Sequence, residues 1–380
     1  MASCGQPSFT FGIEEEYFLI SHATCALVCE PPRQMLDECA AELGERFAIE
    51  YQRSQVEVAT KVCTSMSAAR AELANLRSKA AAIGSRYGVA PIAASTHPFS
   101  AWRTQRHADK RRYNAIAQDL KGVGRRMVIS GMHVHVGIDD EDQRIALMNE
   151  LREFLPLLLA LSTSSPFWQG ENTGLKSYRT AINDATPRKG VPEWFASWNE
   201  YCRTIETMVR SGVIEDATKI WWDLRPSARF PTLEMRITDV CPLLADGITI
   251  AALYRCILRM LYRLRRQNQR WRTYPPFLVR ENRWRAQRYG TTEGMVDFGK
   301  GAVVPFPELI EELLELVGED ADHFGCTAEV ARAREIVERG TSADRQLARF
   351  EAVKGLGGTG QAAVVAVVDG IIDDTMLMPS

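Results

Sequence analysis

Glutamates spaced two residues apart are the first feature of this chain whose type and spacing indicate chemistry. Glu14 and Glu16 lie within residues 11–19, where alternating apolar and polar side chains predict a β-strand. The opposite face of that strand carries Phe11, Ile13, Tyr17 and Leu19. Two carboxylates at this spacing point the same way and lie roughly 7 Å apart. A buried concavity can use such a pair only with a cation, so other strands should direct complementary ligands to the same space.

Two further predicted strands carry ionic residues on one face. In residues 54–59, Glu57 lies opposite two valines. In residues 232–239, three apolar side chains face the core, which leaves Glu234 and Arg236 together on the other side. A carboxylate beside a guanidinium also fits a plain cross-strand ion pair. Because an ionic face recurs on several strands, we favour a shared polar cavity.

A pair of histidines occupies one face of another predicted strand. Residues 127–138 alternate so that His133 and His135 share a face with Gly131 and Gly137. Glycine within a strand often marks a place where another group approaches closely. A single histidine here would favour a core role, whereas two on one glycine-flanked face favour ligands.

The ligand types indicate which ion such a cavity would hold. Converging carboxylates repel one another by roughly 1 to 4 kcal/mol per pair at effective dielectric constants of about 80 to 20. Cations must offset this repulsion, or protons will. Oxygen-rich ligation with one or two imidazoles suits Mg²⁺ or Mn²⁺, which usually share their remaining positions with substrate phosphates. An adjacent arginine is then typical of a phosphate clamp.

Helical and turn patterns predict the elements that must position these strands. We expect a helix over residues 65–87 ended by Gly88, a strand over 89–94, a helix over 141–162 disturbed by Pro156, and a helix over 193–212. Further helices are expected over residues 243–269, 308–317, 328–339, 343–353 and 361–372, where apolar spacing is 3.6 residues. The long loop 164–179 contains Trp168 and Arg179, and we expect it to contact substrate.

Composition bounds the class of protein. The 380 residues are 46% hydrophobic and 25% charged, which is typical of a soluble globular chain with a sizeable core. A net charge of -2 gives no indication of a nucleic-acid or membrane partner. Residues 1–10 lack a cationic start followed by an apolar run, and the longest apolar runs are too short to span a bilayer. Nine cysteines without a Cys-x-x-Cys pair fit reduced thiols, so we expect a cytoplasmic protein.

A glycine-rich run near the end of the chain matches a nucleotide-binding pattern by spacing alone. Residues 355–360 fit G-x-G-x-x-G, but a helix is predicted before them where a dinucleotide site needs a strand. A P-loop would need Lys at Gln361 and Ser or Thr at Ala362. We therefore expect a linker between helices.

Taken together, the motifs resemble the type 2 glutamate-cysteine ligases, also described as carboxylate-amine ligases. The resemblance rests on residues 12–17 (GIEEEY), 131–137 (GMHVHVG), 165–170 (SPFWQG) with Tyr178 and Arg179, 220–227 (IWWDLRPS), 233–236 (LEMR), 281–285 (ENRWR) and 288–290 (RYG). These segments run in order over most of the chain. The resemblance implies an α+β fold similar to glutamine synthetase and the guanidino kinases, with a curved, mainly antiparallel sheet and helices on its convex face.

Residue roles follow from the same resemblance. It implies that the metal ligands are Glu14, Glu16, Glu57, His133 and Glu234. Arg236 is implied as a phosphate contact and, with Glu234, as a catalytic residue. Position in the matching segments alone places Arg225 and Arg285 at the nucleotide, and Arg179 and His135 at the substrate. We expect one catalytic domain over residues 1–380, sheet-rich over 1–240 and mostly helical over 241–380, and a homodimer.

The implied reaction is ATP-dependent amide formation with Mg²⁺ or Mn²⁺. A carboxylate, favoured as the γ-carboxylate of glutamate, attacks the γ-phosphoryl group of ATP and gives an acyl phosphate, from which an amine displaces phosphate. Glutamate and cysteine would give γ-glutamylcysteine. An alternative is a metal-dependent hydrolase or oxygenase built on His133 and His135, weakened by the shortage of further histidine ligands. A non-enzymatic binding protein would leave the converging carboxylates without a purpose.

Overall fold

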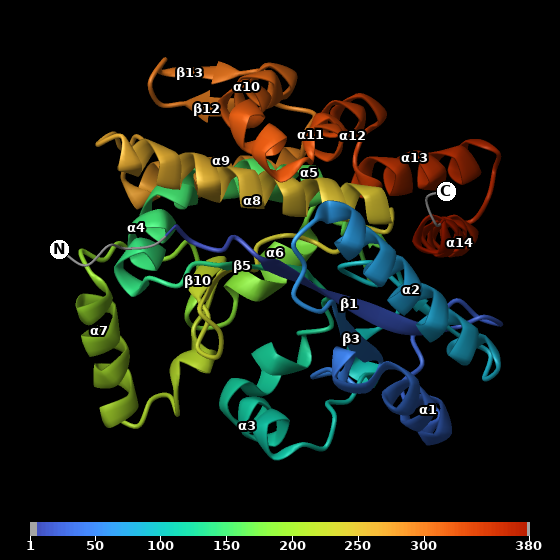
Figure 1. Ribbon diagram of the computed structural model, residues 1–380. Helices are drawn as coiled ribbons and strands as arrows, with labels where there is room; N and C mark the ends of the chain where they lie inside the picture. Colours follow the sequence, from blue (N-terminus) through green and yellow to red (C-terminus); the bar gives the residue numbers. More distant parts are fainter. Residues whose placement is uncertain (1–5, 378–380) are drawn as a thin grey trace.

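The computed structural model describes residues 6–377, and β1 (Phe11–Ser21) is the central strand of its main sheet. This seven-stranded sheet has the order β10-β11-β5-β1-β3-β2, with β4 paired to the far end of β1, and every pair is antiparallel (Figure 1). The other strands are β2 (Phe47–Ile49), β3 (Gln55–Ala59), β4 (Val89–Ile92), β5 (Met132–Gly137), β10 (Leu224–Pro226) and β11 (Thr232–Met235). The predicted mixture of helices with a mainly antiparallel sheet is confirmed.

Strand register brings the predicted ionic residues side by side. Directly opposed pairs are Glu14 with His133, Glu16 with Glu57, and Glu234 with His135. Residues directly opposite each other in an antiparallel pair project from the same face of a sheet. Four strands that lie apart in the sequence therefore present one continuous ionic face.

The other face of the sheet is apolar and covered by helices. Phe11, Ile13 and Tyr17 are buried there. Above them lie α8 (Leu244–Arg266), buried along most of its length, and α2 (Met66–Ser85), which packs on β4 and α8 (Figure 1). Apolar side chains of these strands and helices thus form a core on this face, and the ionic face is left to line a cavity.

One carboxylate interrupts the apolar face. Glu15 alternates with Ile13 and Tyr17, and it is completely buried. Arg77 of α2 binds it with two hydrogen bonds, 2.8 Å from Nη2 to Oε1 and 2.9 Å from Nε to Oε2. The same guanidinium donates to the carbonyl groups of Cys241 and Pro242, so this buried ion pair joins β1, α2 and the entry to α8.

The elements between the strands of residues 1–240 differ from their predicted bounds. The helix predicted over 141–162 is divided into α4 (Glu141–Leu151) and α5 (Leu155–Ser162), with Pro156 in the first turn of α5. The helix predicted over 193–212 is α7 (Trp198–Arg210). Unpredicted helices are α1 (Arg33–Leu43), α3 (Arg111–Arg125) and α6 (Tyr178–Asp184). Short strands β6 (Phe167–Trp168) and β7 (Glu171–Asn172) form a hairpin, and β8 (Lys189–Gly190) pairs in parallel with β9 (Trp221–Trp222).

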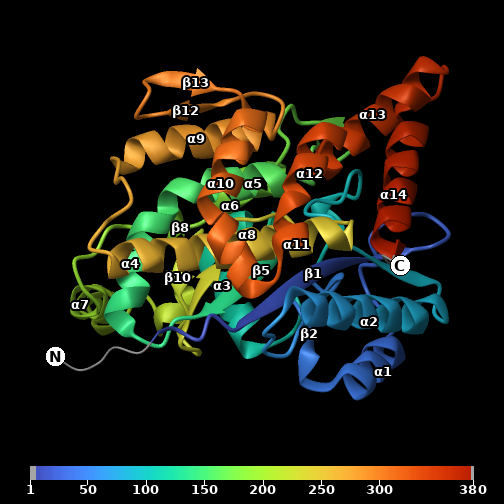
Figure 2. The ribbon, with the colours of Figure 1, turned by 45° about the horizontal axis from the view of Figure 1, so that its top comes forward.

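The second half is mostly helical, as predicted. Figure 2 shows α10 (Phe306–Phe324), α11 (Thr327–Ala331) and α12 (Ala333–Arg339) stacked over α8. The predicted stretch 328–339 is thus two helices, and α9 (Pro276–Tyr289) and the hairpin β12 (Met295–Asp297)–β13 (Ala302–Val304) were not predicted. The glycine run joins α13 (Ser342–Gly355) to α14 (Gly360–Met376), which confirms the interhelix linker.

Two further sequence predictions concern disulfide bonds and membrane-spanning segments. The eight cysteines within residues 6–377 are all free, which agrees with reduced thiols, and Cys4 lies outside the described residues. Within the same residues, no helix combines the length and the apolar character needed to cross a membrane. The curvature of the sheet, the likeness to glutamine synthetase and the guanidino kinases, and the single domain stay predictions.

Candidate active site

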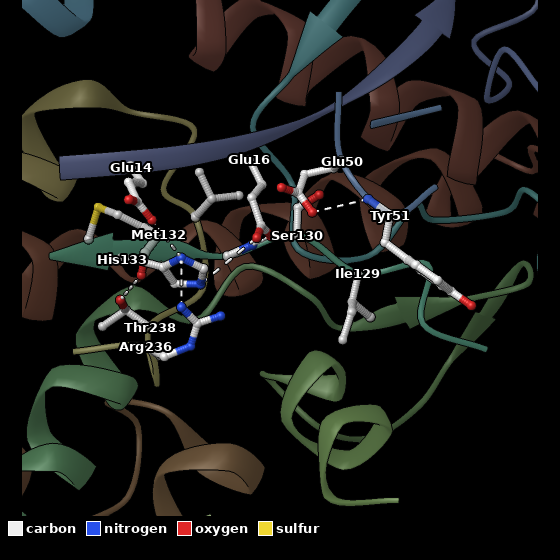
Figure 3. Close-up of polar contacts among 12 residues, drawn as sticks. Glu14, Glu16, Glu50, Tyr51, Ile129, Ser130, Met132, His133, Arg236 and Thr238 are labelled. Carbon is white, nitrogen blue, oxygen red and sulfur yellow. Dashed lines mark hydrogen bonds and ion pairs between the residues drawn. The ribbon is translucent and has the colours of Figure 1, made fainter. Parts of the chain in front are cut away.

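A cavity of about 280 Å³ lies on the ionic face of the main sheet. Its lining includes every predicted metal ligand, together with His135, Arg179, Arg225 and Arg236. Figure 3 shows Glu14, Glu16 and His133 projecting from their strands toward Arg236. The sequence-predicted residues, with the exception of Arg285, therefore meet in one place.

Both imidazoles face the carboxylates of neighbouring strands. His133 Nδ1 lies 3.3 Å from Glu14 Oε2, and its Nε2 lies 3.9 Å from Glu16 Oε1. His135 Nε2 lies 3.5 Å from Glu14 Oε1 and 3.9 Å from Glu234 Oε1. Glu14 thus stands between the two histidines, with one oxygen directed to each.

Three overlapping groups of side chains could each hold a cation. They are Glu14 with Glu57 and His133, Glu14 with His135 and Glu234, and Glu16 with Glu50 and Glu57, and within each group the ligand atoms lie within 4.8 Å of one another. Glu14 and Glu57 each belong to two groups. Because a carboxylate has two oxygens, these shared residues could bridge adjacent ions.

Sequence reasoning missed Glu50. It directly follows β2, whose Ala48 pairs with Glu57, so alternation along residues 47–50 puts Glu50 on the acidic face. Its carboxylate accepts a hydrogen bond from the Tyr51 N–H at 3.0 Å and lies beside Glu16 in Figure 3. The signal was present in Phe-Ala-Ile-Glu, but three residues are too short a strand to be recognised from sequence alone.

The acidic end of the cavity carries more negative charge than the protein neutralises. Burial, and then the charge of Glu50, raises the pKa of Glu16 to about 7. Burial and the charges of Glu50, Glu14 and Glu16 raise the pKa of Glu57 well above its ordinary value. Burial also raises the pKa of Glu50. Divalent cations would relieve this repulsion, and the oxygen-rich donor set fits Mg²⁺ or Mn²⁺.

The histidine end is already prepared for ligation. Burial and the adjacent Arg236 charge lower the pKa of His133 to about 3, so the imidazole is neutral at physiological pH. Burial alone would raise the pKa of Glu14, but hydrogen bonds with His133 and His135 hold it well below its ordinary value. Neutral imidazole and ionised carboxylate are the forms that bind a metal.

Two arginines hold the remaining carboxylate of the cavity. Arg225 Nε donates to Glu234 Oε2 at 2.9 Å, and Arg236 Nη1 donates to Glu234 Oε1. Burial would raise the pKa of Glu234, but the charges of Arg236 and Arg225 hold it well below its ordinary value. Arg236 Nη1 also lies 3.4 Å from His133 Nδ1, which places its guanidinium among the ligand groups.

Arg179 is held by the backbone that directly follows β11. Its guanidinium donates to the carbonyl groups of Ile237 and Arg236, both at 3.0 Å. A Cβ added at Gly131 would lie 2.3 Å from Arg179 Nη2, so only glycine leaves room for this side chain. The close approach inferred from the glycine-flanked histidines is therefore made by Arg179.

Asp239 anchors the segment that carries Arg179. Its Oδ2 accepts from the Ser164 N–H at 2.9 Å and the Ser165 hydroxyl at 2.8 Å, and its Oδ1 accepts from the Ser177 hydroxyl at 2.9 Å. All four side chains are buried. The loop predicted to contact substrate is thus tied at both ends to Asp239, four residues beyond β11.

Arg285 is the predicted site residue that the structure does not bring to the cavity. Its Nε donates to the Gly294 carbonyl at 2.8 Å, beside the β12–β13 hairpin. The buried arginine of the same motif is Arg283, which binds Asp223 and Asp184. The nucleotide role of Arg285 stays a prediction that the geometry does not support.

Part of the cavity wall comes from residues to which the sequence assigned no role. Asn183 of α6, Lys189 of β8 and Trp221 of β9 line it, and so does Tyr113 of α3. An adjoining groove of about 1030 Å³ shares residues 227–230 with this cavity. Only β8–β9 pairing, which joins residues far apart in the sequence, brings Lys189 to the site.

Comparison with known sequences gives matches along nearly the whole chain. The family described as glutamate-cysteine ligase family 2 matches residues 10–363. A protein of Rhodospirillum rubrum named "Putative glutamate--cysteine ligase 2" is 55% identical over 375 residues, which is 98% of this chain and 96% of that protein. One of the same name from Jannaschia sp. is 52% identical over 366 residues, or 96% of each chain.

Solved structures of lower sequence identity share the fold. The glutamate–cysteine ligase of Francisella tularensis, solved in complex with AMP, superposes with a TM-score of 0.67 at 13% identity and covers 96% of this chain and 92% of its own. A bifunctional glutathione synthetase from Pasteurella multocida gives a TM-score of 0.68 at 15% identity and covers 96% and 52%. The fold of this chain is therefore that of known glutamate–cysteine ligases.

Proposed function

The chain belongs to glutamate-cysteine ligase family 2 and is an enzyme of the carboxylate-amine ligase type, and from this premise we propose that it joins glutamate to cysteine at the expense of ATP. Membership confirms the resemblance inferred from the motifs. It also leaves the hydrolase or oxygenase alternative without support.

The observation that carries this proposal is the three overlapping groups of possible metal ligands in the cavity that Arg236 also lines. Glu14, Glu16, Glu50, Glu57, His133 and Glu234 would hold two or three divalent cations. When bound, Mg²⁺ or Mn²⁺ would neutralise the negative charge of the ATP phosphates. Glu50 joins the predicted ligands because it completes the group with Glu16 and Glu57.

In the proposed reaction the protein supplies position and charge. Arg236, held among the ligands by Glu234, would neutralise the charge that develops on the transferred phosphoryl group. Arg225 orients Glu234 and lines the same cavity. Arg179 and His135 would contact the amino-acid substrates. The carboxylate of the acid substrate attacks the γ-phosphorus of ATP, the bond from that phosphorus to the β,γ-bridging oxygen breaks, and ADP leaves. The amine then attacks the carbonyl carbon of the acyl phosphate, phosphate leaves with the former carboxylate oxygen, and the amine gives up one proton.

A labelling experiment tests this proposal most directly. Glutamate with heavy oxygen in its γ-carboxylate is incubated with ATP, Mg²⁺ and cysteine, and ADP, dipeptide and phosphate are measured together. We expect ADP and dipeptide in equal amounts and one labelled oxygen in each phosphate released, because the attacking oxygen leaves with phosphorus. The Glu14→Gln variant, purified identically, controls for contaminating ATPase.

Each part of the proposal has its own contrary result. Dipeptide formed with unlabelled phosphate would exclude the acyl phosphate while leaving the ligase activity. Pair-dependent ADP release with other amino acids would correct the substrates. Absence of ADP release with any pair would contradict the proposed reaction. We also propose a homodimer in the cytoplasm with one catalytic domain, and sedimentation of the purified chain tests the first of these.

A further inference from the structure

Lys189 is a basic side chain of the active-site cavity that the proposed reaction does not yet use. It lines the cavity from β8, and its Nζ lies 5.6 Å from the centre of the Trp221 ring. Within residues 6–377 its ammonium group has no hydrogen-bond or ion-pair partner. Asn183, one turn of α6 beyond Arg179, lines the same wall, and its side-chain amide also has no partner among these residues.

The neighbouring cations differ from Lys189 because they are already engaged. Arg179 donates to two backbone carbonyl groups, and Arg236 donates to Glu234. Burial and the charges of Arg236 and Arg179 lower the pKa of Lys189 well below its ordinary value. An anion bound in this part of the cavity would favour the charged ammonium, since an opposite charge stabilises a buried cation.

The backbone holds Lys189 in place. The preceding residue, Arg188, has a φ of 60°, a left-handed conformation that a non-glycine residue adopts at a cost of about 1 kcal/mol. Its Nε donates to the Lys219 carbonyl at 2.9 Å, and its own carbonyl accepts from the Trp221 N–H at 3.0 Å. The backbone of Lys189 is therefore fixed in a strand pair, and both Lys189 and its partner Trp221 line the cavity.

We propose that Lys189, with the side-chain amide of Asn183, binds the non-reacting α-carboxylate of an amino-acid substrate and so helps to determine which acids the enzyme accepts. This inference rests on the proposed function. An ammonium and an amide N–H₂ are donors that recognise a carboxylate without a metal ion.

An anionic oxygen at Lys189 could belong to a carboxylate or to a phosphate of ATP. The carboxylate is favoured because the phosphates belong where the cations would sit, among Glu14, Glu57 and His133. In the same cavity the wall of Asn183, Lys189 and Trp221 contributes no carboxylate that could hold a metal ion. The non-reacting end of an amino acid needs its own cation, and Lys189 is available.

Equilibrium binding measurements distinguish a substrate carboxylate from an ATP phosphate as the group that Lys189 binds. Calorimetry is performed on the full chain with Mg²⁺ and a non-hydrolysable ATP analogue, using each common amino acid and its α-carboxamide. We expect the wild type to bind at least one acid tenfold or more tightly than its carboxamide. Lys189→Met should reduce this preference below threefold, Lys189→Arg should keep most of it, and the affinity for the ATP analogue should change less than threefold.

Two further variants guard against a folding defect. Asn183→Asp should weaken binding of the acid but not of the carboxamide, because it adds a negative charge beside Lys189. Lys354→Met, which removes an exposed lysine of α13, should change neither affinity. Melting temperatures of all variants are compared with that of the wild type.

Three results would overturn the inference. They are an undiminished carboxylate preference in Lys189→Met, a selective loss of affinity for the ATP analogue, and no carboxylate preference in the wild type. ADP release by the wild type is measured separately. If the wild type releases ADP with an amino-acid pair but Lys189→Met keeps the full carboxylate preference, the proposed ligase function stands and the proposal for Lys189 fails. If the carboxylate preference depends on Lys189 but no ADP is released, the proposal for Lys189 stands and the proposed ligase function fails.

Discussion

Glu15 and Arg77 form a two-point ion pair on the buried face of β1, directly behind the carboxylates of Glu14 and Glu16. Three consecutive glutamates thus belong to two environments. The outer two face the cavity, and the middle one joins β1 to α2 and to the carbonyl groups of residues 241 and 242. Because successive side chains of a strand point to opposite faces, three consecutive residues can line the cavity and also hold the strand to the helices behind it.

Substitution of these neighbours should separate the two roles. Glu15→Gln leaves the Arg77 charge buried without its partner and should lower the free energy of unfolding by about 3 kcal/mol. Glu14→Gln should leave that free energy within about 1 kcal/mol and reduce turnover by orders of magnitude. Urea unfolding and ADP release measure the two effects. Equal stability of the two variants would contradict the structural role of Glu15.

Glu57 and Glu234 should respond oppositely to loss of charge. Within the described part of the chain Glu57 has no hydrogen-bond or ion-pair partner, and its neighbours are Glu14, Glu16 and Glu50. Glu57→Gln should therefore raise the stability of the metal-free protein at pH 8 by about 1 kcal/mol. Glu234→Gln leaves Arg225 and Arg236 unpaired and should lower it by about 2 kcal/mol.

Metal-free samples of both variants are compared by thermal unfolding, with and without Mg²⁺. Added Mg²⁺ should stabilise the wild type, because a ligand that binds only the folded state raises its stability. The gain should be smaller in both variants, and turnover should be lost in both. A metal-free Glu57→Gln protein that melts below the wild type would show that Glu57 is structural.

Gly131 should tolerate no side chain. An added Cβ would lie 2.3 Å from Arg179 Nη2 and 2.8 Å from its Cζ, and the guanidinium is held by two carbonyl groups. Gly131→Ala should reduce turnover at least a hundredfold by displacing Arg179. Gly318→Ala in α10, where an added Cβ meets nothing within 4 Å, is the matched control. It should keep full turnover and gain about 0.5 kcal/mol of helix stability.

His97 should make the protein less stable in mild acid. It is buried, its Nδ1 accepts from the N–H groups of Phe99 and Ser100, and burial lowers its pKa to about 4. The unfolded chain, with a histidine pKa of about 6.5, binds the proton first. The free energy of unfolding should therefore fall by about 2 kcal/mol between pH 7 and pH 4.5 through this residue.

The measurement is the difference in urea unfolding between the wild type and His97→Gln at several pH values. That difference should shrink as the pH falls from 6.5 toward 4, because the glutamine does not titrate. His22→Gln, which replaces an exposed histidine, is measured in parallel as the control for a histidine-to-glutamine substitution. A constant difference across this range would contradict the assignment.

Alternation along the chain predicted the four strands that carry chemistry, because each has one apolar and one ionic face. It correctly placed Glu14, Glu16, Glu57, His133 and Glu234 on the cavity side. Alternation alone did not predict what each of these residues does. The order of those strands could not be predicted. It depends on contacts such as Arg77 with Glu15, which are 62 residues apart.

What the sequence missed has a common physical cause. Glu50 follows a strand of three residues, and Lys189 lies in one of two. Such short segments carry too few side chains for a period to be recognised, so only tertiary pairing places them. Arg285 is the converse case, since it lies in a matching motif but its side chain binds the Gly294 carbonyl instead of the cavity.

The buried hydrogen bonds of Asp239 have a consequence for how this scaffold can diversify. They hold Ser164, Ser165 and Ser177, and with them Arg179, whereas the wall of Asn183, Lys189 and Trp221 lies beyond that anchor. Substitutions in this wall can therefore accumulate without disturbing the carboxylates and histidines of the main sheet that would bind the cations. Libraries that randomise residues 183, 189 and 221 should yield folded enzymes with altered acid or amine preference, whereas randomising residues 164, 165 and 239 should yield mostly insoluble chains.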